Sequence, residues 1–174
     1  ERKSGRNLFL ARIKTTIQTI NQEMIDNLEL SQCLEMLSTN YIGRLAYISG
    51  KKPYLVPITY FHDAEEKRII SYASEGHKIR AMRNYEWVTV QVDDIDSIQE
   101  WRSVQVQGRF EEFKGSTAKK YLQKFADGVQ YTINKKTGER PRFIQDFSSR
   151  LQNEKIPVVY AINITNIVGK IRND

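Results

Sequence analysis

One short segment of the chain combines the residue types that bind phosphate groups. Ser74-Glu75-Gly76-His77-Lys78 offers a hydroxyl, an imidazole and an ammonium group, and Arg80 follows closely. Ser74 is placed to cap a helix that we predict over residues 75–84. Cations at the start of a helix oppose its dipole, by roughly several tenths of a kcal/mol each, unless an anion binds there. The segment therefore predicts a phosphate site formed by free helix amides, Ser74 and Lys78.

A proline interrupts the strand that lies before this segment. Residues 53–61 read as a strand, and Pro57 stands in its middle. Proline cannot donate a hydrogen bond to a neighbouring strand, so we expect this strand at a sheet edge or at a bulge. Neighbouring peptide groups then stay free, and a planar heterocycle rich in donors and acceptors could use them. His62 follows in a polar turn and is interpreted as a solvated turn residue, with a ligand role as the alternative.

Composition limits the class of protein. The 174 residues are 40% apolar, which is typical of a single globular domain with a full core. Cys33 is the only cysteine of the chain, so no internal disulfide can form and a reducing compartment is expected. We interpret Cys33 as an inert packing residue. No apolar run near the start is long enough for a signal peptide or a membrane span, so a cytoplasmic protein without membrane contact is expected.

The net charge of +6 is unevenly distributed. Residues 21–113 carry a net charge of −5, and the positive charge lies in residues 1–20 and 114–174. A protein that bound a nucleic-acid backbone across its main face would not have an acidic centre, so nucleic acid is not an expected partner. Residues 1–27 form a basic arm, which is either mobile or in contact with an acidic partner or surface.

The rest of the pattern is mainly β. Six segments are predicted as strands: residues 42–49, 53–61, 68–73, 87–93, 101–113 and 158–168. The other predicted helices are a short amphipathic helix capped by Ser31, a helix from Ser116 to about Ala126 before a basic turn at residues 134–138, and a helix opening at Pro141. Asp93-Asp94-Ile95-Asp96 lacks the glycine and glutamate of a calcium loop, so we predict no metal site.

This order of elements favours a mainly β fold with peripheral helices (α+β). We predict a six-stranded antiparallel split β-barrel over residues 28–174, with a helical insertion at 114–156 and a closing strand at 157–170. Residues 114–156 are longer than a plain barrel needs, so a lid, a dimer extension or a pocket wall are all open interpretations of them.

Several motifs, in this order, are similar to those of one protein family. They are Gly43-Arg44-Leu45, Pro53 to Tyr60, Ser74 to Ile79, Trp101-Arg102-Ser103-Val104 with Gly108-Arg109, and Ile162 to Lys170. Residues 28–113 and 157–170 resemble the pyridoxamine 5′-phosphate oxidase-like, FMN-binding split-barrel family, and within it the flavin-binding branch grouped with nitroimidazole-resistance reductases.

The resemblance implies a homodimer that binds FMN at its subunit interface. The residues it places along the isoalloxazine ring are Val56, Pro57, Ile58, Thr59 and Tyr60. Those it places at the FMN phosphate are Ser74, His77 and Lys78, which agrees with the argument from the helix start. It also brings Trp101, Arg102 and Ser103 to the flavin, from either subunit.

One departure separates this chain from the family's authentic oxidases. Their last segment carries arginine and histidine residues that grip the substrate phosphate, and Gly169-Lys170-Ile171-Arg172-Asn173-Asp174 does not match it. Vitamin B6 oxidation is therefore not implied.

The leading hypothesis is an FMN-dependent oxidoreductase acting on an unidentified small molecule, with NAD(P)H or another electron donor. The flavin would carry the chemistry, so no catalytic residue is assigned. One alternative is a non-catalytic flavin- or haem-binding or sensing protein of the same fold. Another, disfavoured by the acidic centre, is a basic-armed adaptor for nucleic acid or a partner protein.

Overall fold

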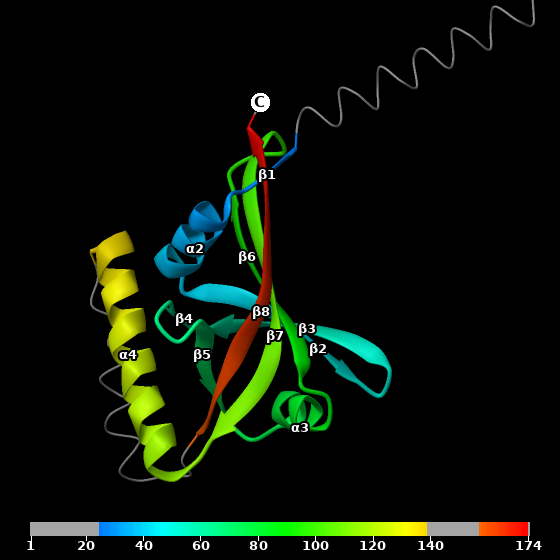
Figure 1. Ribbon diagram of the computed structural model, residues 1–174, viewed down its shortest axis with the longest axis vertical. Helices are drawn as coiled ribbons and strands as arrows, with labels where there is room; N and C mark the ends of the chain where they lie inside the picture. Colours follow the sequence, from blue (N-terminus) through cyan, green and yellow to red (C-terminus); the bar gives the residue numbers. More distant parts are fainter. Residues whose placement is uncertain (1–24, 139–156, 174) are drawn as a thin grey trace, which may run out of the picture.

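Strands predominate in the part of the chain that the structure describes, and three helices lie among them. The structure, a computed structural model, describes residues 25–138 and 157–173 (Figure 1). Its elements in chain order are β1 (Asp26–Asn27), α2 (Leu30–Thr39), β2 (Ile42–Ser49), β3 (Lys52–Thr59), β4 (Phe61–Asp63), β5 (Arg68–Ala73), α3 (His77–Asn84), β6 (Trp87–Ile95), β7 (Glu100–Phe113), α4 (Gly115–Thr137) and β8 (Val158–Asn173). Most of the basic arm and the predicted helix at Pro141 lie outside the described residues.

The sheet is antiparallel and bends back on itself. Its strand order is β3-β2-β6-β7-β8-β5-β4, and β1 pairs with the far end of β8. β3 and β4 stand at opposite ends of this order, yet Tyr60 alone joins them in the chain. The sheet must therefore curl until its two ends meet, and Ser71 Oγ of β5 donates a hydrogen bond of 2.8 Å to the Thr59 carbonyl of β3 at this junction.

This architecture confirms the predicted fold class, a mainly β split barrel with peripheral helices. The sheet has eight strands among the described residues, not the predicted six. The two additional strands, β1 and β4, are two and three residues long, which is too short for alternation to reveal them.

Alternating apolar positions build the core as the sequence predicts. Val90 and Val92 of β6 lie opposite Val106 and Val104 of β7, and all four side chains are buried. Each buried side chain of this size contributes about 1.5–3 kcal/mol. A second apolar cluster, around Phe125, lies between the sheet and α4. Apolar contacts thus stabilise the sheet on both of its faces.

β8 carries a bulge where it passes from the barrel into an arm formed with β6 and β7 (Figure 1). The register between β7 and β8 shifts between Gln107 and Gly108, and Thr165 is left without a partner in β7. The Thr165 hydroxyl donates a 3.0 Å hydrogen bond to the Gln107 carbonyl. An extra residue reverses the alternation of faces beyond it. Ile164 and Ile167 consequently face the same side.

α2 covers the arm, and a glycine allows its close approach. A Cβ atom on Gly169 of β8 would lie 2.5 Å from Cys33 Sγ of α2. Cys33 is buried, and burial raises the pKa of its thiol, so it carries less of the reactive thiolate form. This agrees with its interpretation as a packing residue. β8 continues past its predicted end near Gly169 because β7 pairs with it as far as Asn173.

The predicted cap of α2 is wrong. Glu29 is the N-cap, and its backbone N–H donates a 2.9 Å hydrogen bond to Gln32 Oε1, whereas Ser31 lies inside the helix. Leu30, predicted on the apolar face, is 59% exposed, while Leu37 is fully buried. The helix thus begins two residues earlier than predicted, and the side chains that it buries are Cys33, Met36 and Leu37.

His62 is buried in β4 rather than solvated in a turn, so this prediction is also wrong. Its side chain is 5% exposed, and its Nδ1 lies 2.8 Å from Ser38 Oγ of α2. The short strand β4 pairs with β5 and draws His62 beneath α2, whereas the polar turn begins only after Asp63.

α4 is about twice as long as predicted. It starts at Gly115, without a side-chain cap from Ser116, and continues to Thr137, where Gly138 ends it in a left-handed conformation. The expected basic turn is the last turn of this helix. Gly128, beyond the predicted end of the helix, lies against β4, since a Cβ atom there would come within 2.2 Å of the Phe61 ring. The glycine allows close packing and does not end the helix.

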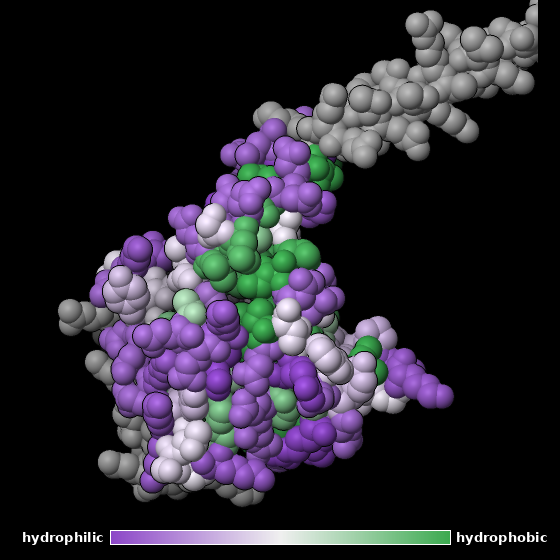
Figure 2. All heavy atoms as spheres, viewed as in Figure 1, coloured by the Kyte–Doolittle hydropathy of each residue, from purple (hydrophilic) through white to green (hydrophobic). Residues whose placement is uncertain are grey.

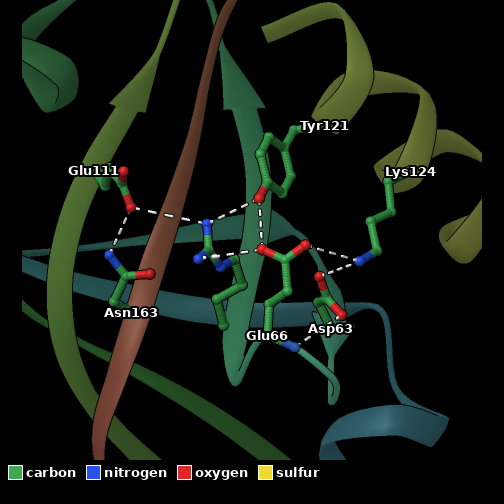
Figure 3. Close-up of polar contacts among 7 residues, drawn as sticks. Asp63, Glu66, Glu111, Tyr121, Lys124 and Asn163 are labelled. Atoms are coloured by element: carbon green, nitrogen blue, oxygen red, sulfur yellow. Dashed lines mark hydrogen bonds and ion pairs between the residues drawn. The ribbon is translucent and has the colours of Figure 1, made fainter. Parts of the chain in front are cut away.

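A polar cluster attaches α4 to the β4–β5 connection (Figure 3). Lys124 Nζ lies 2.5 Å from Asp63 and 3.4 Å from Glu66, and the Tyr121 hydroxyl donates a 2.5 Å hydrogen bond to Glu66. Arg68 of β5 lies 3.2 Å from Glu66. Asp63 is only 3% exposed, so Lys124 is the group that neutralises a buried carboxylate.

Replacing Lys124 by methionine should lower the free energy of unfolding by about 2–3 kcal/mol, since it leaves the Asp63 charge buried without a partner. This is below the usual cost for a fully buried pair because the Lys124 side chain is 28% exposed. Urea denaturation measures the loss. Lys119→Met, on an exposed position of the same helix, is the control and should change stability by less than about 0.5 kcal/mol. Equal effects of the two substitutions would contradict the assigned ion pair.

The β2–β3 hairpin turns through two residues with positive φ. Ser49 pairs with Lys52, and the loop residues Gly50 and Lys51 have φ of 55° and 66°. Two-residue hairpin loops with positive φ at both positions favour glycine or asparagine. Lys51 is exposed and therefore adopts this backbone without packing that would compensate for it.

Replacing Lys51 by glycine should raise the free energy of unfolding by about 0.5–1 kcal/mol, because glycine adopts positive φ at no steric cost. Thermal and urea unfolding give the measurement. Lys52→Gly is the matched control: it places glycine in a strand and should lower stability by a similar amount. A loss of stability with Lys51→Gly would show that the hairpin turns differently.

Candidate functional site

The outer edge of β3 is free, as the proline predicts. β3 is the terminal strand of the sheet and pairs only with β2, where Pro57 lies opposite Arg44. Ile58 faces the core and Pro57 faces outward. The peptide groups on the other edge of β3 are thus not used by a neighbouring strand over most of its length.

Tyr60 contributes less to this edge than the other four predicted ring residues. Its side chain is fully buried, its hydroxyl donates a 2.9 Å hydrogen bond to the Leu37 carbonyl, and its N–H donates to the Tyr41 carbonyl at 2.8 Å. Only its own carbonyl is left for a ligand. Of the five predicted ring residues, Val56, Pro57, Ile58 and Thr59 therefore form the free edge.

α3 begins two residues later than predicted. Gly76 is the N-cap, in an extended conformation, and no side chain caps the helix, so the predicted cap by Ser74 is wrong. Glu75 and Gly76 form a bend between Ser74 and the first helical residue. His77 and Lys78 are the first helical residues, and this first turn contains no acidic side chain. Its amide N–H groups have no acceptor within the helix.

Lys78 is a half-buried cation without an anionic partner in the part of the chain that the structure describes. Its Nζ lies 5.9 Å from the centre of the Tyr160 ring, and burial lowers the pKa of its ammonium group. The Tyr160 hydroxyl is buried without a hydrogen-bond partner there, and burial raises its pKa to about 12. A bound anion would give the Lys78 ammonium group the negatively charged partner that the described residues do not provide.

An aromatic cluster of Tyr47, Tyr54 and His77 borders the start of α3. Tyr47 and Tyr54 are cross-strand partners in the β2–β3 hairpin, and their rings stack at 5.4 Å with an interplanar angle of 11°. The His77 ring lies 4.8 Å from Tyr54, and its Nδ1 lies 3.2 Å from the Tyr47 hydroxyl. The sequence prediction missed both tyrosines, although the two-residue turn at Gly50 fixes the register that pairs them.

A cavity of about 380 Å³ adjoins Tyr47 on the outer face of β2 and β6. Trp87 and Tyr85 line it together with Gln107 of β7, and both aromatic side chains are about half exposed. Broad aromatic surfaces of this kind suit planar molecules. The cavity therefore extends the aromatic surface of the hairpin away from α3.

Trp101, Arg102 and Ser103 lie at the end of the molecule that is opposite α3. They belong to the arm, where Arg102 lies opposite Ile171 next to β1, far from α3 (Figure 1). Ser103 donates a 2.9 Å hydrogen bond to Asp93. One chain therefore brings Ser74, His77 and Lys78 together beside the β3 edge but does not bring these three arm residues to them.

Asp93, in the segment that resembled a calcium loop, is held by protein groups. Arg44 lies 2.5 Å from it, and Gln91 donates to it at 2.7 Å, in addition to Ser103. Within residues 25–138 and 157–173 there is no cluster of three acidic, histidine or cysteine side chains able to hold a metal ion. Among the same residues, no helix has the length and apolar character needed to span a membrane.

Comparison with known sequences gives two matches. A family model described as pyridoxamine 5′-phosphate oxidase matches residues 29–171. An uncharacterised protein of Rhizobium meliloti (strain 1021) is 35% identical over 81 residues, which are 47% of this chain and 52% of that protein. The match thus spans about half the length of this curated relative.

Solved structures share the fold. A FAD-binding protein from Mesorhizobium loti has a TM-score of 0.65 at 28% identity, covering 87% of this chain and 98% of that chain. A FAD and haem binding protein from Mycobacterium smegmatis has a TM-score of 0.63 at 16% identity, covering 87% and 74%. A candidate 5-nitroimidazole antibiotic resistance protein from Bacteroides thetaiotaomicron has 0.60 at 12% identity, covering 84% and 88%. The family match covers most of the chain, which therefore belongs to the pyridoxamine 5′-phosphate oxidase family.

Proposed function

We propose that this protein is an FMN-dependent oxidoreductase whose cofactor phosphate binds at the start of α3. The observation that carries the proposal is Lys78, a half-buried ammonium group with no anionic partner among the described residues, at a helix start that has no acidic side chain. Partial burial weakens water's stabilisation of this charge, and a phosphate would replace it.

The surrounding groups support a phosphate at this position. Free N–H groups of the first helical turn and the helix dipole both favour an anion. Ser74 precedes them on an exposed stretch, and its hydroxyl forms no helix cap, so it can donate to a ligand. His77 lies at the rim, fixed by Tyr47 and Tyr54. The phosphate would thus meet backbone amides, a hydroxyl and a cation together.

The free edge of β3 supports the position of the flavin ring. Along Val56, Pro57, Ile58 and Thr59 no strand pairs with the outer edge of β3, although the Thr59 carbonyl accepts a hydrogen bond from Ser71. The isoalloxazine ring has both donors and acceptors for the peptide groups that remain free there. When bound, the flavin supplies the transfer of a hydride or electrons, and the protein supplies position and electrostatics.

We propose a homodimer in which a second copy completes the site with Trp101, Arg102 and Ser103. Within one chain these residues lie at the far end of the arm, so only another copy can bring them to the β3 edge. Two apolar side chains next to them support a contact there: Ile95 is 68% exposed and Ile98 is 83% exposed. Exposed apolar residues gathered at one end of a molecule are typical of an interface.

The remaining parts of the proposal concern reactants and location. The electron donor would be NAD(P)H or another small donor, and the acceptor an unidentified small molecule. A cytoplasmic location fits the single buried cysteine. The alternative is a flavin- or haem-binding protein without turnover, which the haem-binding Mycobacterium smegmatis neighbour favours.

Replacing Lys78 by alanine should weaken FMN binding by about tenfold to a hundredfold, the effect of losing one charge-assisted hydrogen bond. Quenching of flavin fluorescence during titration gives the dissociation constant. Riboflavin, which lacks the phosphate, should bind the wild type more weakly than FMN and lose little further affinity with Lys78→Ala. The control is Lys119→Ala, an exposed cation on α4. Unchanged FMN affinity in Lys78→Ala would remove the phosphate assignment.

The absorption spectrum separates the functions. A flavin band that NADPH or NADH bleaches under anaerobic conditions would support the oxidoreductase. A flavin band that no donor bleaches would support the sensor, and a Soret band would support haem. Parallel titrations with FMN and FAD decide the nucleotide, and we expect FMN to bind more tightly because only its phosphate is terminal. A preparation that binds no flavin would contradict the proposal.

A further inference from the structure

A second cavity lies between α2, the β4–β5 connection and β8, with a volume of about 420 Å³. This is within the size range of small-molecule sites. Its lining residues are Leu30, Leu34, His62, Ala64, Lys67, Ile164, Thr165, Asn166 and Ile167. Apolar surface gathers in front of β8 beside α2 in the space-filling view (Figure 2). The lining contains no residue of β3 or α3 and is therefore separate from the proposed flavin site.

One buried polar side chain in this lining has an unused nitrogen. The Ser38 hydroxyl has a single proton and donates it to the Leu34 carbonyl at 2.9 Å. If Ser38 keeps this donation, the 2.8 Å contact between Ser38 Oγ and His62 Nδ1 places the ring proton on Nδ1. Burial lowers the pKa of His62, which keeps the ring neutral. His62 Nε2 is consequently an acceptor without a proton.

His62 lines the cavity, and 5% of the residue is accessible to solvent. Its Nε2 forms no hydrogen bond with any described residue. A lone acceptor in apolar surroundings calls for one hydrogen-bond donor.

The charge at the rim of the cavity is positive. Lys67 is exposed there and makes no ion pair within the described residues, and the lining contains no acidic side chain. Glu66, the residue before Lys67 in the sequence, is held by Arg68, Lys124 and Tyr121. A ligand with a carboxylate at this rim would meet a cation that no protein group neutralises.

We propose that this cavity is a second binding site, for a small apolar carboxylic acid that donates an O–H or N–H group to His62 Nε2 and places its carboxylate near Lys67. Hydroxyaryl alkanoates are the chemical class that combines these three features. The apolar body would lie against Leu30, Leu34 and Ile167, which are left partly open to solvent. A water-filled gap would not need such an apolar wall.

The test uses 4-hydroxyphenylacetate as the probe and nuclear magnetic resonance of the imidazole nitrogens. The chain has two histidines, so His62 and His77 give two spin systems, which are assigned by the loss of one in His77→Gln. In the free protein we expect His62 as the Nδ1–H form. The probe should shift Nε2 of His62 and leave His77 unchanged. Phenylacetate, which lacks the donor, and 4-ethylphenol, which lacks the carboxylate, should each bind about fivefold to tenfold more weakly.

Variants separate this site from the flavin site. His62→Phe should reduce probe affinity about tenfold and remove the preference for 4-hydroxyphenylacetate over phenylacetate. Lys67→Gln should weaken the probe by less than about fivefold and leave 4-ethylphenol unaffected. Lys52→Gln is the exposed control. FMN affinity should stay unchanged in both His62→Phe and Lys67→Gln.

Four outcomes would overturn the proposal. They are an Nε2–H or doubly protonated His62 in the free protein, no probe-induced shift of His62 at millimolar concentration, equal binding of the probe and phenylacetate, and nuclear Overhauser contacts that place a second copy over Ile164 and Ile167. The wild-type spectra decide these points even if His62→Phe fails to fold.

Discussion

Tyr60 carries the chain from one end of the sheet to the other, and the shape of the barrel depends on this crossing. Its hydroxyl and N–H are bound to the carbonyls of Leu37 and Tyr41, and its ring is fully buried. Because β3 and β4 are separated by this single residue, the sheet cannot stay flat. The two ends meet at Thr59 but do not pair along their length. The free edge of β3 is a direct consequence.

Some partly buried charges have a partner of opposite charge in the described part of the chain, and Lys78 does not. This contrast supports the proposed phosphate site at the start of α3. Asp63 is buried beside Lys124, and Asp93 beside Arg44. Lys78 is also partly withdrawn from water, yet the group that it faces among the described residues is the uncharged ring of Tyr160. A cation in such surroundings lowers the stability of the free protein. A ligand that binds only the folded state would offset this loss of stability.

The sequence was most informative where a periodic pattern was long. The valines of β6 and β7 and the edge position of Pro57 followed from alternation and from proline's missing N–H. The chain was misread where one tertiary contact decided the outcome. α4 was predicted to end near Ala126, but it continues through Gly128, which packs against Phe61. His62 looked like a turn residue because β4 is too short to show a period.

The candidate site was predictable only in its local parts. His77 and Lys78 were found because they adjoin each other at a helix start. The Tyr47–Tyr54 stack was not found, since it depends on the register of a hairpin. The arm residues at 101–103 came from resemblance alone, and no local pattern could have linked them to α3. The parts of the site that depend on contacts between segments far apart in the sequence could therefore not be predicted from local patterns.

β8 connects the two proposed sites while keeping them distinct. Tyr160, near its start, lies beneath Lys78, and Ile164 and Ile167 line the cavity that contains His62. In a regular strand, residues three apart point to opposite faces. The unpaired Thr165 inserts one residue and turns Ile167 to the side of Ile164. The apolar wall of the second cavity therefore depends on the bulge, whereas the contact of Tyr160 with Lys78 lies before it and does not.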